Sequence, residues 1–130
     1  MLVSSSAFAE INPASDMAPR HSMEMFTDFD TTDKVLLGAS FFLGAIDMGQ
    51  TLHISESCHT DGKYFETSAA LGKCPEKHQV YQYFAESALI TYAIAKILPS
   101  DYRKAWLTGT IIYEFTYVDH NFQMGVGVDF

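Results

Sequence analysis

Residues 35–54, VLLGASFFLGAIDMGQTLHI, decide the fold of this 130-residue chain. Positions 36–46 are apolar or small on every side, so a helix here has no polar stripe to face water. Twenty mainly apolar residues also match the length that crosses a bilayer. Asp47, Gln50 and His53 interrupt the second half of the segment. The segment therefore predicts a long helix that is embedded in a membrane or in a protein core.

Two more apolar stretches predict a second helix over residues 75–98 and a third over 100–123. Pro99 separates them, because proline cannot continue a helix. With a first helix over 33–55, the chain predicts an all-α fold, a small bundle of three main helices. A short extended tail is expected over 126–130.

A membrane-embedded bundle is the preferred interpretation. The mean hydropathy of +0.02 is low for a membrane protein, but it averages apolar stretches with the polar segments 10–33 and 55–77. Tyrosines lie largely toward the predicted helix ends, as in interfacial belts. Small residues recur at helix-packing spacing, as in Ser40 with Gly44. A soluble, exported helical bundle remains the alternative.

The N-terminus has features of an exported protein. Residues 1–9 resemble the end of a signal peptide, with Ala7 and Ala9 at the spacing of a cleavage site. Residues 10–32 then form a polar arm, and residues 33–130 form the helical domain. We expect the bacterial cell envelope, in the inner membrane or alternatively the periplasm.

The only two cysteines, Cys58 and Cys74, lie in the polar connector between the first two helices. In an oxidising compartment they could form a disulfide. A cleaved signal peptide would place that connector inside the cell in a three-span protein, so the two inferences conflict. The connector also contains 64–71, expected as a short helix or re-entrant segment.

Composition argues against two classes of ligand. The eight Lys and Arg residues are scattered and the net charge is −8, so nucleic acid is not an expected partner. Zinc would need ligand pairs such as C-x-x-C or H-x-x-x-H, which are absent. We therefore predict no metal and no cofactor.

Acidic residues inside the apolar stretches mark the candidate site. Asp47, Gln50 and Thr51 share one helix face, and Glu114 and Asn121 share another. If these faces meet, they form a polar seam inside an apolar bundle. The full set of candidate seam or ligand-site residues is Asp47, Gln50, Thr51, Glu66, Glu114, His120 and Asn121.

Two interpretations of this seam stay open. Interhelical hydrogen bonds could simply fix the register of the helices. Alternatively, buried carboxylates with His120 could hold an ion or relay protons. The Glu-x-x-His spacing of di-metal bundles is absent, because Glu114 and His120 are six residues apart. No residue is assigned a catalytic role.

The spacing of these residues resembles a family of small proteobacterial and phage envelope proteins that has no assigned activity. Its pattern is D-W-G-Q-T … E-x-N-P-x-L-G-x-x-P … E … H-N … G. This chain has DMGQT at 47–51, ETSAALGKCP at 66–75, Glu114, and His120 followed by Asn121. It departs from the pattern at Ser68-Ala69 and at Cys74, which makes a local Cys58–Cys74 bridge more plausible.

Three functions are compatible with these patterns. The first is a non-enzymatic accessory or interaction subunit in the membrane, with lipid and a protein partner or a second copy as its contacts; the resemblance implies a phage association. The second is an enzyme or ion-binding protein that uses the carboxylate and histidine cluster. The third is a soluble exported bundle that binds another protein.

Overall fold

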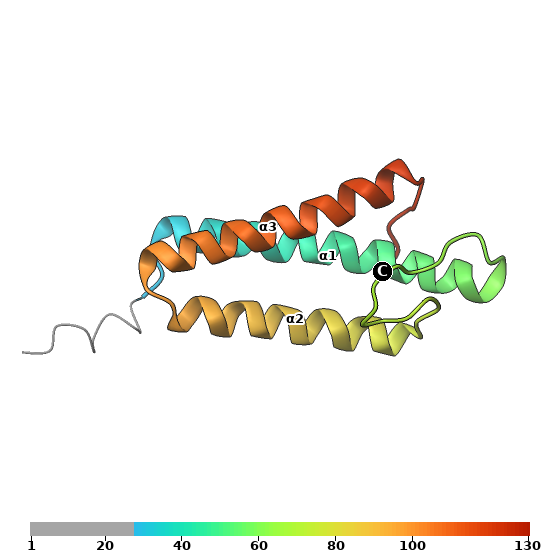
Figure 1. Ribbon diagram of the computed structural model, residues 1–130, viewed down its shortest axis with the longest axis horizontal. Helices are drawn as coiled ribbons and strands as arrows, with labels where there is room; N and C mark the ends of the chain where they lie inside the picture. Colours follow the sequence, from blue (N-terminus) through green and yellow to red (C-terminus); the bar gives the residue numbers. More distant parts are fainter. Residues whose placement is uncertain (1–27) are drawn as a thin grey trace, which may run out of the picture.

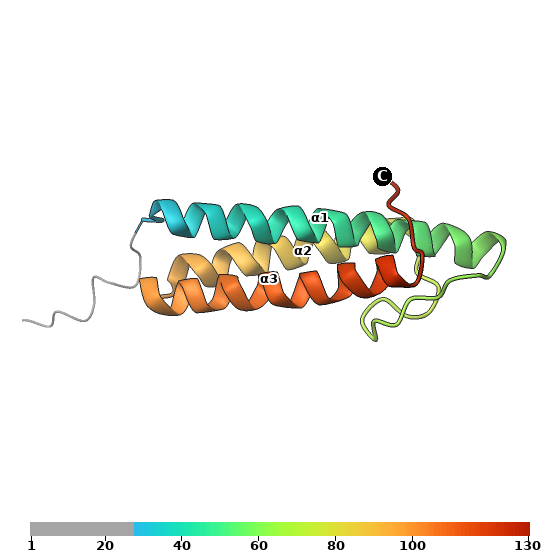
Figure 2. The same cartoon turned by 90° about the horizontal axis from the view of Figure 1, so that it is seen from above.

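The computed structural model describes residues 28–130, which form one elongated bundle of three helices (Figures 1 and 2). The helices are α1 (Thr31–Thr60), α2 (Lys77–Ile97) and α3 (Ser100–Gln123). They run alternately up, down and up, and α1 packs more extensively on α3 than on α2. No strand occurs among the described residues. The prediction of an all-α three-helix bundle is confirmed.

The first helix is longer than its apolar segment. It begins at Thr31, because Asp30 and Asp33 form a capping box in which each carboxylate accepts the backbone N–H of the other residue. It ends at Thr60, and two residues later Gly62, with a positive φ of 66°, donates its N–H to the Ser57 carbonyl at 2.8 Å. The predicted signal-peptide remnant and residues 10–27 of the predicted arm lie outside the described residues.

The connector between α1 and α2 contains no helix at 64–71, contrary to one of the two forms expected for it. Its backbone forms isolated bonds instead, including Glu66 N–H to Lys73 O at 2.9 Å. Cys58 and Cys74 are joined by a disulfide. The connector therefore folds back onto the end of α1, and we name this part of the bundle, residues 56–76, the disulfide end.

At the opposite end, one buried arginine joins all three helices. Arg103 of α3 has no exposed surface, and its guanidinium bonds Asp33 of α1 at 2.7 Å. It also donates to Ala95 O at 2.7 Å and Leu98 O at 3.1 Å, carbonyls that the end of α2 cannot pair internally. Outside this pair, Lys104 bonds Asp30 at 2.8 Å, which lowers the pKa of the Asp30 carboxyl.

Between the two ends, the bundle buries many polar side chains and leaves many apolar ones exposed. As many polar as apolar side chains are buried in the described part of the chain, seven of each. Large apolar side chains are instead exposed along the helices: Val35, Phe41, Phe42, Leu89, Ile90, Tyr92, Ile97, Ile112, Tyr113 and Phe115. Water would normally drive such side chains inward.

By length and composition α1 alone, among the described helices, could cross a membrane. Only 28% of its most apolar window is buried in the bundle, whereas a core helix of a soluble protein would be mostly buried. The other two helices lack a stretch that is both long and apolar enough, although their 21 and 24 residues correspond to about 32 and 36 Å. These lengths are close to the roughly 30 Å hydrocarbon core of a bilayer.

Candidate functional site

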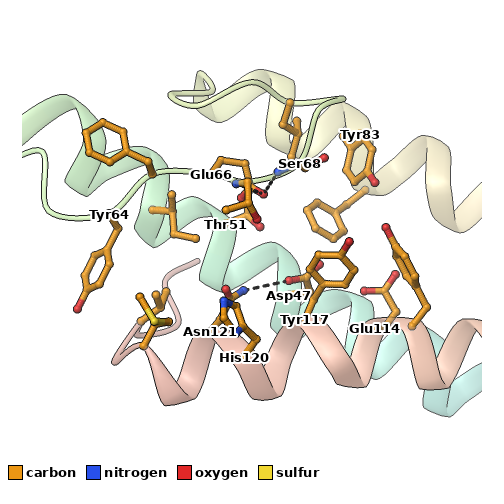
Figure 3. A pocket seen from close by; sticks show the side chains of 18 of the residues that line it. Asp47, Thr51, Tyr64, Glu66, Ser68, Tyr83, Glu114, Tyr117, His120 and Asn121 are labelled. Carbon is orange, nitrogen blue, oxygen red and sulfur yellow. Dashed lines mark hydrogen bonds between the residues drawn. The ribbon is translucent and has the colours of Figure 1, made fainter.

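A pocket of about 280 Å³ lies where the connector meets the middle of the bundle (Figure 3). All three helices, the connector and the segment after α3 contribute to its walls. Six of the seven candidate residues line it: Asp47, Thr51, Glu66, Glu114, His120 and Asn121. Gln50, the seventh, lies fully buried behind Asn121. The helix faces that carry the polar residues therefore do meet.

Three of these residues form a hydrogen-bonded chain between α1 and α3. Gln50 Nε2 donates to Val118 O at 3.3 Å, and Asn121 Nδ2 donates to Gln50 Oε1 at 3.2 Å. The same Asn121 amide lies 3.4 Å from Asp47 Oδ1 (Figure 3). Because Gln50 has no exposed surface, these bonds satisfy amide atoms that would otherwise be costly to bury. This part of the seam fixes helix register.

Asp47 and Glu114 lie close enough to interact, one on α1 and the other on α3. Oε2 of Glu114 is buried and has no hydrogen-bond partner. Among residues 28–130, neither carboxyl forms an ion pair. A seam that served only to fix helix register would not need an unpaired acceptor such as Glu114 Oε2. The part of the seam around Asp47 and Glu114 therefore differs from the part around Gln50, where the amide atoms are hydrogen-bonded.

The connector supplies the third acid of the pocket. Glu66 Oε1 accepts the backbone N–H groups of Thr67 at 3.0 Å and Ser68 at 2.8 Å, which holds its carboxylate in a tight turn (Figure 3). Glu66 and Asp47 border the same pocket, one from the connector and the other from α1. Thr51 is buried in the wall, and His120 is exposed at the edge.

Aromatic rings form much of the remaining wall, which the sequence patterns did not predict. Tyr83 and Phe84 of α2 contact each other edge to face, with ring centres 5.2 Å apart. Tyr113 and Tyr117 of α3 lie with ring centres 4.8 Å apart. The helical spacing places Tyr117 on the same face as Glu114, whereas the expectation of interfacial belts assigns the tyrosines to the helix ends. A tyrosine on the same helix face as Glu114 is the sequence feature that indicates an aromatic wall at the site.

The acid of α2 does not join the site. Glu86 is exposed and accepts a hydrogen bond from Gln82 Nε2 at 2.8 Å, one turn away on the same helix. In the sequence, Glu86 lies within an apolar stretch just as Asp47 and Glu114 do, but the rotation of α2 turns its carboxylate away from the other two.

The segment after α3 closes over α1 near the pocket. Tyr64 OH of the connector donates to Gly125 O at 3.1 Å. Further along, Asp129 N–H bonds Gly49 O at 3.0 Å, and the Asp129 carboxylate contacts His53 Nδ1 at 2.6 Å. A Cβ at Gly49 would overlap the Val128 side chain, so only glycine permits this approach.

One cluster at the disulfide end resembles a metal site. Cys58, His59 and Cys74 place ligand atoms within 4.8 Å of one another, and no other such group of three occurs among residues 28–130. The two sulfur atoms are bonded to each other. Metals bind the thiolate form of cysteine, so the oxidised chain offers only the imidazole here.

Glu114 also borders two further cavities. A groove between α1 and α2 includes Ser40, Gly44 and Ala88, and a groove between α2 and α3 includes Ala105 and Gly109. Both grooves are lined mainly by apolar or small residues, and both reach Glu114. One carboxyl is therefore shared by the polar pocket and two apolar grooves.

Comparison with known proteins gives no assignment: no protein family, no curated protein and no solved structure matches the chain.

Proposed function

We propose that this chain is a small integral membrane protein of the bacterial envelope, seated in the inner membrane, that acts without enzymatic activity as an accessory or interaction subunit. The observation that carries the proposal is the reversed burial pattern. Arg103, Asp33 and Gln50 are among the most buried side chains, while Phe42 and Leu89 are 67% and 68% exposed. Lipid is the solvent in which that arrangement is stable.

The disulfide supports one orientation. Disulfides persist on the oxidising side of a membrane, so the disulfide end faces the periplasm and Asp30, Arg103 and Lys104 lie at the cytoplasmic end. This orientation conflicts with a cleaved signal peptide and favours an N-terminus inside the cell. The resemblance to small proteobacterial and phage proteins supports an envelope location and extends the proposal to a phage-associated role.

The proposed contacts are lipid along the apolar sides and a protein partner, or a second copy, for the interaction role. Substitution of a lipid-facing residue tests the membrane part. Phe42→Lys should reduce recovery of the protein in membranes, because a lysine at the centre of a span costs about 2.5–3.5 kcal/mol on insertion scales. Glu56→Lys changes an exposed residue at the disulfide end and serves as the control.

Carbonate extraction of the unmodified chain completes the experiment. We expect the protein to resist carbonate extraction. We also expect Cys58 and Cys74 to react with a thiol reagent only after a reductant has been added, because they form a disulfide. Release by carbonate, together with full tolerance of Phe42→Lys, would contradict the proposal. That outcome would leave a soluble periplasmic bundle with a Cys58–Cys74 disulfide, since an exposed lysine is harmless in water.

A further inference from the structure

The polar pocket is lined by more acidic than basic side chains. Asp47, Glu66 and Glu114 border it, and none of the three is ion-paired among the described residues. The basic side chains in its wall are Lys63 and His120. Lys63 lies over the ring of Tyr64, with its Nζ atom 4.9 Å from the ring centre. A positively charged occupant would relieve the repulsion among the acids.

The spacing of the acids argues against a bare metal ion. Ligand oxygens around one cation lie close together, because each is within about 2.6 Å of the ion. Among residues 28–130, the group of three ligands within 4.8 Å of one another is at the disulfide instead. The pocket acids therefore surround a space larger than one ion, and its volume of about 280 Å³ fits a small organic molecule.

The aromatic wall and the unpaired acceptor identify the chemistry of that molecule. Ring faces attract cations, and the half-buried Tyr83 lines the pocket together with the more exposed Tyr113 and Tyr117. Oε2 of Glu114 is buried without a donor, so an occupant with an N–H group would satisfy it. Alkyl groups would lie against the rings while the ammonium group faces the carboxylates.

We propose that the pocket formed by Asp47, Glu114 and the tyrosine wall binds a small organic ammonium ion that carries at least one N–H donor. The inference goes beyond the proposed membrane role and does not rest on it, because the same pocket would exist in a soluble chain. It makes the connector that carries Glu66 the cover of a ligand site.

Three probes of similar size separate the contribution of positive charge from that of the N–H donor. tert-Butylammonium has charge and N–H donors, tetramethylammonium has charge alone, and tert-butanol has neither charge nor N–H. Binding to the purified full chain is followed by ligand-observed NMR titration at neutral pH, with circular dichroism to check folding. We expect saturable binding of tert-butylammonium, at least threefold weaker binding of tetramethylammonium and at least tenfold weaker binding of tert-butanol.

Charge-neutral variants locate the site. Glu114→Gln should weaken tert-butylammonium binding at least tenfold, whereas Glu86→Gln, the same change at an exposed acid of α2, should leave it within twofold. If Glu114→Gln fails to fold, Asp47→Asn provides the same test, because asparagine keeps an oxygen for the Asn121 amide.

Several results would overturn the proposal. They are the absence of saturable tert-butylammonium binding, equal binding of tert-butanol, or an equal loss in the Glu86→Gln control. Displacement of tert-butylammonium by stoichiometric Mg²⁺ or Zn²⁺ would instead make the pocket a metal site, which also contradicts it. None of these results bears on carbonate extraction, so the two proposals fail separately.

Discussion

Replacing Arg103 with alanine should destabilise the bundle by about 3–5 kcal/mol, the usual cost of removing one partner from a buried ion pair. The structure supports a value in this range. Arg103 and Asp33 expose 0% and 1% of their side chains, so the variant would strand a buried carboxylate. Two carbonyls at the end of α2 would also lose their donor, at about 1–3 kcal/mol for each group left unsatisfied.

One neighbour limits the loss. Lys104 Nζ lies 3.5 Å from the other oxygen of Asp33 and could move closer in the variant. We therefore expect the lower part of the range, about 3 kcal/mol. The free energy of unfolding can be measured by reversible denaturation in mixed micelles, or in urea if the chain proves soluble. Adding Asp33→Asn completes a double-mutant cycle that isolates the coupling between the two side chains.

The matched control is Lys77→Ala. Lys77 and Glu56 form an ion pair of 3.3 Å, but both side chains are more than half exposed. Such pairs contribute less than about 1 kcal/mol. The reasoning is refuted if Arg103→Ala costs no more than Lys77→Ala, or if the cycle gives no coupling between Arg103 and Asp33.

Three further predictions concern the tail, the connector and the start of α1. Gly49→Ala should displace the tail at a cost of about 1–3 kcal/mol and speed hydrogen exchange at the tail amide bonded to residue 49, whereas Gly44→Ala, with open space around it, should not. Equal exchange in both variants would contradict the tail contact. Replacing Cys58 and Cys74 together with serine should lower the free energy of unfolding by about 3 kcal/mol for a loop of this length. An unchanged denaturation midpoint would be inconsistent with that value. The pKa of Asp30 is lowered in the folded chain, so its stabilising effect is present above the ordinary aspartate pKa and is lost as pH falls through the lowered value. Amide NMR shifts of the first turn of α1, followed against pH, should show one acid transition below the ordinary aspartate range.

The helices and the seam could be predicted because their signals are local. Pro99 marks a helix boundary whatever the tertiary structure, and helical spacing places Asp47 with Gln50, and Glu114 with Asn121. Once two such faces exist in apolar helices, packing them together lets their polar groups hydrogen-bond to each other, which avoids the cost of leaving those groups unpaired in apolar surroundings. The fold and much of the pocket lining follow from that rule.

Other features depend on contacts between residues far apart in the chain. Arg103 is one of several basic residues near a helix start. Nothing in the local sequence indicates that Arg103 forms a buried ion pair with Asp33 while the adjacent Lys104 forms a more exposed one with Asp30. The sequence suggests that Gly49 allows two helices to pack closely, but the atoms nearest to it belong to the tail, at residues 128–130, and not to another helix. The expected end of α1, residue 55, is five residues too early, because the polar residues 56–60 continue the helix up to the turn at Gly62.

The position of Glu114 at the junction of three cavities has a consequence for how an occupant would arrive. The pocket is covered by the connector, but the grooves beside α2 lead to the same carboxyl from the apolar sides of the bundle. In a bilayer, those sides would contact lipid chains. Amphiphilic amines partition into membranes and reach local concentrations well above those in the surrounding water. Their apparent affinity should therefore rise with their lipid solubility in vesicles and lose that dependence in detergent, where no bilayer reservoir exists.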